Sequence, residues 1–210
     1  MKVVIIEGPD NCGKNTIINR LLEENEISEV IHCSKPEGET DEEKFQFQEM
    51  SFVRLARRAS DRLHEDSIAN LDEFLRKLRP SKYCDCLLDV IIFNRAWYGE
   101  YVYGQMYRNG DPKKILELID RCERYFEEEE EYTNVYYIQL MSTSTKLLKG
   151  NDDGKSLSDA DEEKIKRECD LFMDVYNHSK LNKRVIYINK GDNFRSREEI
   201  ADEAMEFINS

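Results

Sequence analysis

The stretch that most constrains the fold lies at the start of the chain. Residues 3–6 form a short, apolar, β-branched run that is typical of a buried strand, and a loop bounded by Gly8 and Gly13 follows it. After the loop come Lys14 and a segment with apolar residues at the spacing of one helix face, namely Ile18, Leu21 and Leu22. The pattern predicts a strand, a loop and a helix in that order.

The loop has the spacing G-x-x-x-x-G-K, which is typical of a phosphate-binding loop. Glycines at both ends let the backbone curl so that successive N–H groups point at a phosphate, and the following helix adds its dipole. Lys14 adds a positive charge for the β- and γ-phosphates of a nucleotide. The predicted nucleotide-binding residues are Pro9, Asp10, Asn11, Cys12, Gly13, Lys14, Asn15 and Thr16. The alternative is a glycine loop that holds no nucleotide.

The position after Lys14 departs from the motif. It usually carries Ser or Thr, whose hydroxyl contacts Mg²⁺, but here it is Asn15, and the hydroxyl comes one residue later at Thr16. We expect Thr16 to contact the metal only indirectly.

Length and composition indicate a soluble, globular chain. We expect its 210 residues to form one domain over residues 1–210, with 40% hydrophobic and 36% charged residues. No apolar run approaches the roughly 20 residues that a membrane-spanning helix needs. Because Met1 and Lys2 lead directly into the first strand, no signal peptide is expected, and we predict a cytoplasmic protein.

Charge and cysteines limit the partners. The formal net charge is −13, with 44 acidic and 31 basic residues, and such a field repels nucleic acid and anionic membranes. We therefore expect nucleotides as partners, bound in a local positive pocket, rather than nucleic acid or membranes. The six cysteines, including Cys84 and Cys86, lack zinc-site spacing and are expected to be reduced.

The next segments add a strand and a long helix. Residues 29–32 predict a second strand, and Lys35 follows in a turn-rich loop. Ligands collect at the C-terminal ends of strands in such sheets, so Lys35 is a candidate for a phosphate or sugar contact, with an ordinary surface lysine as the alternative. Residues 41–78 have a helical pattern that carries a basic cluster of Arg54, Arg57 and Arg58. This cluster is either a solvated face or the source of one arginine that meets a substrate phosphate.

Residues 86–93 are nearly continuously apolar, as expected of a central strand covered on both faces. This strand delivers Asn94 and Arg95 to the C-terminal edge of the sheet. The aromatic stretch 96–108 follows, with the single tryptophan of the chain. We expect some of its hydroxyl-bearing rings to face a nucleoside, and the alternative is that they belong to the core.

The remainder continues the alternation of helices and strands. A helix begins with Asp111 as its N-cap and Pro112 in the first turn. Further strands are predicted at 135–140 and 185–188, with helices at 159–178 and at the end of the chain. The polar segment 141–158 is a candidate lid that would close over phosphates with Lys146 and Lys149, or else an exposed loop. This order predicts a three-layer α/β fold, with a five-stranded parallel sheet and helices on both faces.

These residues together resemble one family. The opening Glu7-Gly8-x-Asp10-x-x-Gly13-Lys14-x-Thr16 is similar to the E-G-x-D-x-x-G-K-[ST]-T opening of thymidylate kinases. Asn94 and Arg95, followed by Tyr103, look like the aspartate-arginine pair of that family and its downstream aromatic residue. The order of elements, including a lid, agrees over essentially the whole chain. The resemblance implies a P-loop kinase fold.

The resemblance also implies roles for single residues. Asp10 would accept a hydrogen bond from the sugar 3′-hydroxyl, Arg95 would hold the acceptor monophosphate, and Tyr103 would lie beside the sugar or base. Asn94, beside Arg95, would lie within reach of the acceptor or the metal. The helix that stacks on and reads the base would correspond to the segment with Phe52 and an arginine of the basic cluster, for which we take Arg57.

The implied activity is transfer of the γ-phosphoryl group of ATP, with Mg²⁺, to a deoxynucleoside monophosphate such as dTMP. Lys14, Arg95, Lys146 and Lys149 would be the catalytic residues, and the chain could form a homodimer. Three departures stand against the family pattern: Asn15, Asn94, and lid lysines in place of arginines. They leave open a nucleoside kinase, a kinase of a modified base in DNA, or a nucleotide-binding regulator with weakened catalysis.

Overall fold

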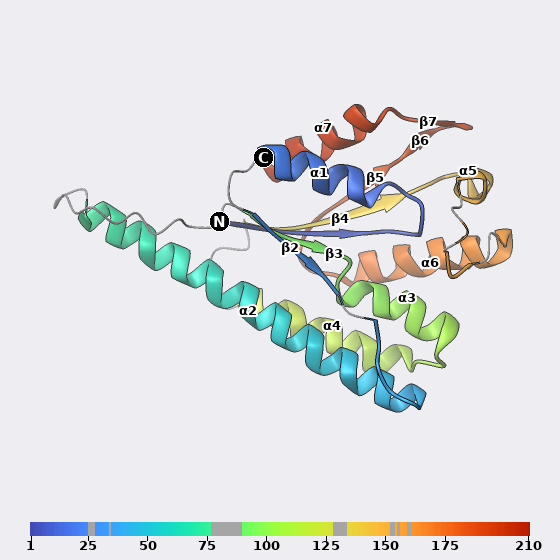
Figure 1. The fold of residues 1–210 in the computed structure, drawn as a ribbon, viewed down its shortest axis with the longest axis horizontal. Coiled ribbons are helices and arrows are strands. Elements are labelled where there is room, and N and C mark those ends of the chain that lie inside the picture. Colours follow the sequence, from blue (N-terminus) through green and yellow to red (C-terminus); the bar gives the residue numbers. More distant parts are fainter. Residues whose placement is uncertain are drawn as a thin grey trace.

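The strand that precedes the phosphate loop lies at the centre of a parallel sheet (Figure 1). A computed structural model describes residues 1–24, 28–33, 35–76, 90–127, 134–151, 154, 156–158 and 161–210. The strands are β1 (Lys2–Glu7), β2 (Ser28–His32), β3 (Val90–Asn94), β4 (Val135–Met141) and β5 (Asn182–Tyr187). They form one five-stranded sheet in the order β2-β3-β1-β4-β5, and every neighbouring pair is parallel.

Helices cover both faces of this sheet, because side chains along each strand alternate between the faces. In β1, Val3 and Ile5 belong to one core, whereas Val4 and Ile6 belong to the other. The first core is covered by α2 (Asp41–Arg76), α3 (Trp97–Tyr107), α4 (Pro112–Glu127) and α6 (Glu162–His178), and the second by α1 (Lys14–Glu24) and α7 (Arg197–Ile208) (Figure 1). The predicted three-layer α/β fold is confirmed.

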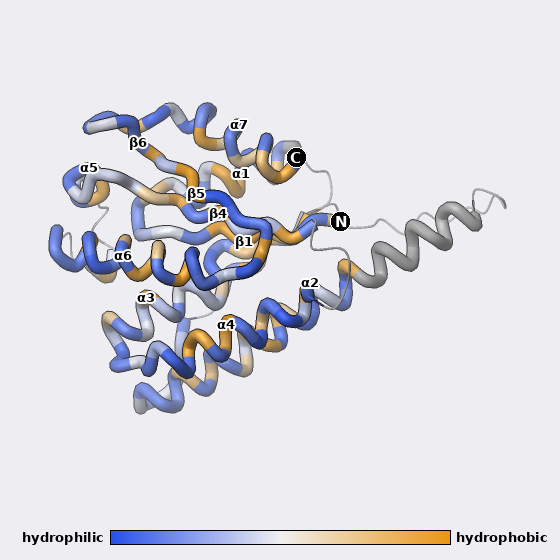
Figure 2. The backbone as a smooth tube through the Cα atoms, turned by 180° about the vertical axis from the view of Figure 1, so that it is seen from behind, coloured by the Kyte–Doolittle hydropathy of each residue, from blue (hydrophilic) through white to orange (hydrophobic). Residues whose placement is uncertain are grey.

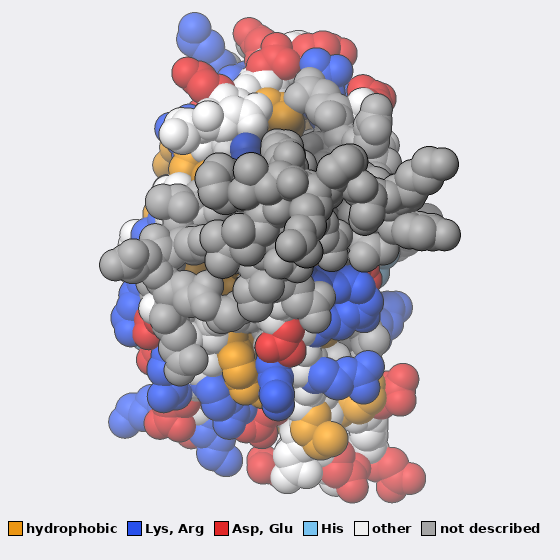
Figure 3. Space-filling view, turned by 90° about the vertical axis from the view of Figure 1, so that its left-hand side faces the viewer, with side chains coloured by type: hydrophobic (Ala, Val, Ile, Leu, Met, Phe, Trp, Pro, Cys, Tyr) orange, Lys and Arg blue, Asp and Glu red, His pale blue; other side chains and the backbone are white. Residues whose placement is uncertain are grey.

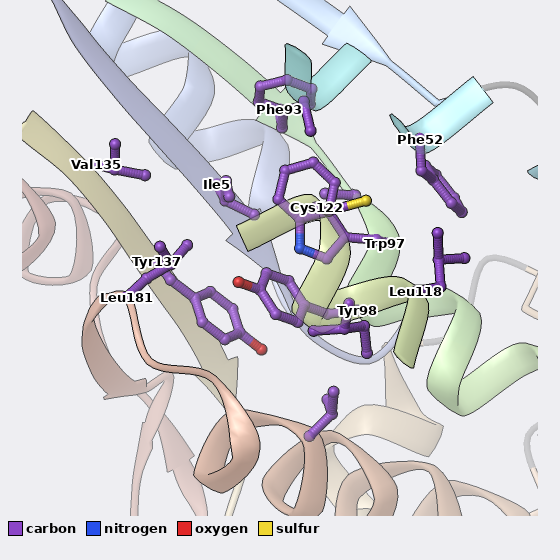
Figure 4. Close-up of a cluster of buried hydrophobic side chains, with 14 of the residues drawn as sticks. Ile5, Phe52, Phe93, Trp97, Tyr98, Leu118, Cys122, Val135, Tyr137 and Leu181 are labelled. Atoms are coloured by element: carbon purple, nitrogen blue, oxygen red, sulfur yellow. The ribbon is translucent and has the colours of Figure 1, made fainter. Parts of the chain in front are cut away.

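The aromatic stretch after β3 contributes mainly to the first core. Trp97 and Tyr98 are fully buried, and the Tyr98 ring stacks on Tyr137 with 4.2 Å between the ring centroids (Figure 4). The Tyr98 hydroxyl donates to Glu123 Oε1 at 2.6 Å, and Glu123 Oε2 accepts from the backbone N of Lys180 at 2.9 Å. This hydrogen-bonded network joins α3, α4 and the segment before β5.

Some segments differ from the sequence prediction. Leu22 is 38% exposed and Ile17 is buried instead, because Leu22 lies past the edge of the sheet-facing side of α1. The lid segment contains a short helix, α5 (Thr145–Gly150), where a polar loop was expected, and Leu148 anchors it in the core. After β5 comes an unpredicted antiparallel hairpin of β6 (Asn189–Lys190) and β7 (Asn193–Phe194).

The four described cysteines, Cys12, Cys33, Cys122 and Cys169, are free thiols, as expected of reduced cysteines. Cys84, Cys86 and residues 86–89 of the predicted central strand lie outside the described residues.

Figure 2 shows hydrophobic residues recurring along α2 and α4 between hydrophilic ones, as expected of helices with one buried face. On the face shown in Figure 3, Lys and Arg side chains are interspersed with Asp and Glu. Among the described helices, none combines the length and the apolar composition that crossing a membrane requires.

Candidate active site

The phosphate loop connects β1 to α1 and requires its glycines. Gly8 and Gly13 have φ angles of +146° and +86°, which side chains rarely permit. A Cβ atom on Gly8 would lie 2.5 Å from the carbonyl oxygen of Leu140, so no other residue fits there. Asn11 has a φ of +62°, a conformation that asparagine adopts more readily than most residues. The loop therefore has the tight curvature that the motif predicts.

Lys14 lies against this loop. Its side chain is buried, and Nζ donates to the carbonyl oxygens of Gly8 at 2.9 Å and Pro9 at 2.7 Å. Phosphate oxygens make stronger, charge-assisted hydrogen bonds with an ammonium group than carbonyl oxygens do, so a bound phosphate can replace these partners. Cys12 Sγ lies 3.6 Å from the same Nζ, and burial raises the pKa of this thiol above its ordinary value.

A polar cluster lies next to the loop and combines residues from distant parts of the chain. Arg95 Nη2 donates to Asp10 Oδ1, and the Arg95 guanidinium lies over the Tyr103 ring, 4.9 Å from its centroid. The Tyr103 hydroxyl and the backbone N of Asp10 both donate to Glu168 Oε1, at 2.6 and 3.3 Å. The structure thus brings together Asp10, Arg95 and Tyr103. It adds Glu168 of α6, which the sequence analysis missed.

Burial sets the protonation of this cluster. Desolvation raises the pKa of the Glu168 carboxyl and raises the pKa of the Tyr103 hydroxyl well above its ordinary value. Burial alone would lower the pKa of Arg95, but the neighbouring Tyr103 and Asp10 outweigh it, and the pKa is raised. Arg95 therefore remains a cation that is hydrogen-bonded to Asp10, and it can hold an anion.

A buried carboxylate connects the phosphate-loop strand to α3. Glu7 Oε1 accepts from the backbone N of Ala96 at 2.6 Å and of Gly99 at 3.2 Å, at the N-terminus of α3. Glu7 Oε2 has no hydrogen-bond partner among the described residues. Burial raises the pKa of Glu7 to about 7, although the backbone hydrogen bonds and the positive charges of Arg95 and Lys14 lower it. Glu7 thus fixes the helix that carries Tyr103 relative to the loop.

The two asparagines that depart from the family pattern contact each other. Asn94 Nδ2 donates to Asn15 Oδ1 at 3.1 Å and lies 3.3 Å from His32 Nδ1. Asn15 belongs to the first turn of α1, His32 ends β2 and Asn94 ends β3. The predicted positions of Asn15 and Asn94 at the site are thus compatible with the structure, and His32 was missed.

The lid segment reaches the loop through residues other than its lysines. Asn151 Nδ2 donates to the carbonyl oxygen of Asn11 at 3.0 Å, and the backbone N of Leu157 lies 3.4 Å from Asp10 Oδ2. Lys149 instead forms an exposed ion pair with Glu162, at 3.2 Å, because α5 directs it toward the start of α6. Lys146 is exposed. Lys149 thus pairs with α6 rather than with the loop, and the catalytic roles of Lys146 and Lys149 stay predictions.

The other predicted substrate contacts are Phe52, Arg57 and Lys35. Phe52 is 3% exposed and packs in the first core, so its ring has no free face for a base (Figure 4). Arg57 is exposed on α2, where it lies 3.9 Å from Asp61. Lys35 is exposed in the loop after β2, and its phosphate contact stays a prediction.

A pocket of about 240 Å³ opens beside the phosphate loop. The loop and the lid form one side of it, and the β6–β7 hairpin and the start of α7 form the other. Its lining includes Asn11, Thr16, Asn151, Ile188, Phe194 and Arg195. Polar groups near the loop and apolar surface near the hairpin suit a nucleobase and its sugar. No sequence pattern indicated this pocket, because the hairpin strands are only two residues long.

The side chains at the expected metal position carry no negative charge. Asn15 and Asn94 are amides, and Thr16, which is half-buried in α1, supplies a hydroxyl. Within the described ranges, no three His, Cys, Asp or Glu side chains gather to hold a metal ion. A Mg²⁺ ion at the loop therefore depends on nucleotide phosphates and water for most of its ligands.

Solved structures share this fold. A thymidylate kinase from Candida albicans aligns with a TM-score of 0.60 and 12% identity over 99% of this chain and 91% of that chain. The YorR protein from Bacillus subtilis, in complex with phosphorylated GDP, aligns with a TM-score of 0.59 and 16% identity over 99% of this chain and 95% of that chain. No protein-family model and no curated protein matches the chain. The structural likeness establishes the P-loop kinase fold expected from the sequence.

Proposed function

We propose that this chain is a nucleoside-monophosphate kinase that transfers the γ-phosphoryl group of ATP to a deoxynucleoside monophosphate, with dTMP or a related pyrimidine as acceptor. The observation that carries the proposal is the pairing of two cationic groups at one sheet edge. Lys14 lies on a glycine-bounded loop, and Arg95 lies beside Asp10 and Tyr103. One group suits the donor phosphates and the other the acceptor phosphate.

The donor would lie along the phosphate loop. The loop N–H groups and Lys14 would hold its phosphates, and the pocket beside Phe194 and Arg195 would take its base. The donor phosphates would hold Mg²⁺, which neutralises phosphate charge when it is bound, and Thr16 would contact the ion only indirectly. Fixing the donor in this way lowers the barrier through position and electrostatics.

The acceptor would lie over the Asp10–Arg95–Tyr103 cluster. The Arg95 guanidinium can bind a phosphate with two parallel hydrogen bonds, while Asp10 accepts from a sugar hydroxyl. A monophosphate acceptor is already anionic, so its attack on the γ-phosphorus needs no general base. A neutral nucleoside hydroxyl would need a carboxylate as general base at the sheet edge, but the residue at that position is Asn94.

The test is ATP consumption measured with each nucleoside and each monophosphate in turn. We expect turnover with pyrimidine deoxynucleoside monophosphates and a loss of roughly 100-fold or more in kcat for Lys14→Ala, because a group that stabilises transferring charge is removed. Lys113→Ala, on the exposed start of α4, is the matched control and should retain full activity. Circular dichroism checks that both variants fold.

Two outcomes would change the assignment. Turnover with nucleosides but not with monophosphates would make the chain a nucleoside kinase. Nucleotide binding without turnover for any acceptor would favour a regulator whose catalysis is weakened at Asn15 and Asn94.

A further inference from the structure

Arg95 has an unusual backbone conformation. Its φ angle is +66°, in the left-handed region that residues other than glycine seldom adopt. The other non-glycine residues with positive φ in the described part of the chain are Asn11 and Asn109, and asparagine tolerates this region better than most residues do. A strained conformation of this kind persists only where the surrounding structure holds it. The contacts that hold Arg95 are therefore part of the site.

The two peptide groups that flank the Cα atom of Arg95 are both fixed by hydrogen bonds. The backbone N of Arg95 donates to the carbonyl oxygen of Ile6 at 3.1 Å. The next peptide group is held at both ends: the backbone N of Ala96 donates to Glu7 Oε1 at 2.6 Å, and the carbonyl oxygen of Arg95 accepts from the thiol of Cys33, with 3.1 Å between sulfur and oxygen. Because peptide groups are planar, these contacts together set the φ and ψ angles of Arg95.

Cys33 reaches this peptide group from the neighbouring strand. The register of β2 with β3 ends at the pair of His32 and Asn94. One residue further along each strand, the side chain of Cys33 meets the carbonyl oxygen of Arg95. Cys33 is partly buried against the first core, and burial raises the pKa of its thiol to about 12. The thiol therefore keeps its proton at neutral pH, as a hydrogen-bond donor must.

We infer that Cys33 is a positioning residue for Arg95: its thiol holds the peptide group after Arg95 in the orientation that the left-handed conformation requires. In this conformation the Arg95 guanidinium donates to Asp10 and lies over the Tyr103 ring. Without the thiol, the peptide group can rotate to relieve the strain, and the guanidinium loses its fixed direction. Cys33 thus acts through Arg95 and not on the substrate. Its effect on an acceptor phosphate rests on the proposed function, in which Arg95 binds that phosphate.

Two substitutions separate the hydrogen bond of Cys33 from its packing. Cys33→Ala removes the donor, whereas Cys33→Ser replaces the thiol with a hydroxyl that can donate to the same oxygen. Cys122→Ala is the matched control, because Cys122 is a buried cysteine of α4 in the same core, and the change removes the same sulfur atom. Circular dichroism and the fluorescence of the buried Trp97 check that each variant folds.

Isothermal titration calorimetry with dTMP, and separately with a non-hydrolysable ATP analogue, gives the first readout. The Kd for dTMP should rise roughly three- to ten-fold in Cys33→Ala, which is the effect of one hydrogen bond. It should stay near the wild-type value in Cys33→Ser and Cys122→Ala, and the Kd for the analogue should be unchanged in all variants. A purely structural role would leave the ratio of the two Kd values unchanged. An unchanged Kd for dTMP in Cys33→Ala, or an equal rise in Cys33→Ser, overturns the inference.

The conformation of Arg95 gives a second readout, and it needs no nucleotide. The NMR chemical shifts of the Cα and Cβ atoms distinguish a left-handed residue from an extended or helical one. We expect left-handed shifts for Arg95 in the wild type and in Cys33→Ser, and their loss in Cys33→Ala. If dTMP binds but the shifts in Cys33→Ala equal those of the wild type, the inference is wrong and the proposed function stands. If dTMP does not bind the wild type, the proposed acceptor is wrong, and the shifts alone decide the role of Cys33.

Discussion

Glu7 offers the sharpest test of the energetics of this site. Its side chain is fully buried, Oε1 receives two backbone hydrogen bonds from the start of α3, and Oε2 receives none. Burial raises its pKa from 4.5 to about 7. Replacement by Gln keeps an oxygen acceptor for the backbone N–H groups and removes the ionisable proton. The change therefore isolates the free-energy cost of ionising the buried Glu7 carboxyl.

The direction in which stability changes with pH follows from proton binding to Glu7. The folded chain holds the Glu7 proton more tightly than the unfolded chain does, so this contribution to stability is fully present below pH 4.5. It is lost as the pH rises through about 7. The pKa difference corresponds to about 3 kcal/mol, at about 1.4 kcal/mol per pKa unit. Glu7→Gln lacks this term, so its unfolding free energy relative to the wild type should rise by about 3 kcal/mol between pH 4.5 and pH 8.

Urea unfolding at several pH values measures this difference. Trp97 is the only tryptophan and is fully buried, so its fluorescence reports the loss of the first core. Other titrating groups cancel in the comparison of variant with wild type. Glu117→Gln, on the exposed face of α4, is the matched control and should give a curve parallel to the wild type. A parallel curve for Glu7→Gln as well would show that burial of Glu7 has no linkage to folding.

Three further changes have expected outcomes. Tyr98→Phe removes the hydroxyl that donates to the buried Glu123, so the unfolding free energy from urea titration should fall by about 1 to 3 kcal/mol; no change would mean that the network contributes nothing. Arg95→Lys replaces a planar fork with a point charge, so acceptor KM should rise and kcat should fall; equal weakening of ATP binding in the absence of acceptor would contradict this role. Asn94→Asp adds a carboxylate, so the Mg²⁺ concentration for half-maximal activity should fall; an unchanged value would place Asn94 away from the metal.

Most of the fold could be predicted because it depends on local patterns. The apolar runs of β1 and β4 mark strands that are buried on both faces, and the helical spacing of apolar residues in α4 marks a helix with one buried face. Both patterns are visible in the sequence. The predicted boundaries of β5 were less accurate, because the strand was expected over residues 185–188. It begins at Asn182 with Lys183 and Arg184, which are polar because β5 is an edge strand, so only its apolar second half gave a signal. The polar lid was predicted as a loop, although α5 needs only Leu148 to anchor it.

The candidate site could be predicted only where a motif marks it. Lys14 and the loop glycines follow from their spacing, and the resemblance to thymidylate kinases pointed to Asp10 and Arg95. Glu168 and His32 carry no local signal, since each reaches the site from an element whose position depends on the whole sheet. The same argument applies to Phe52. A helical pattern does not reveal which side chains of α2 face the core, and the structure places Phe52 there.

The two asparagine departures have a different meaning once their contact is known. Considered separately in the sequence, Asn15 replaces the hydroxyl residue of the thymidylate-kinase pattern and Asn94 replaces its aspartate. Each replacement alone suggests a weakened metal site. In the structure the second amide donates to the first and lies beside His32, so the two substitutions form one hydrogen-bonded unit. A carboxylate at position 94 has no proton to donate, so it would keep a hydrogen bond to Asn15 only if the Asn15 amide turned its Nδ2 toward it. The amides at positions 15 and 94 are therefore hydrogen-bond partners in their present orientation, and the two departures describe a single altered chemistry at the sheet edge.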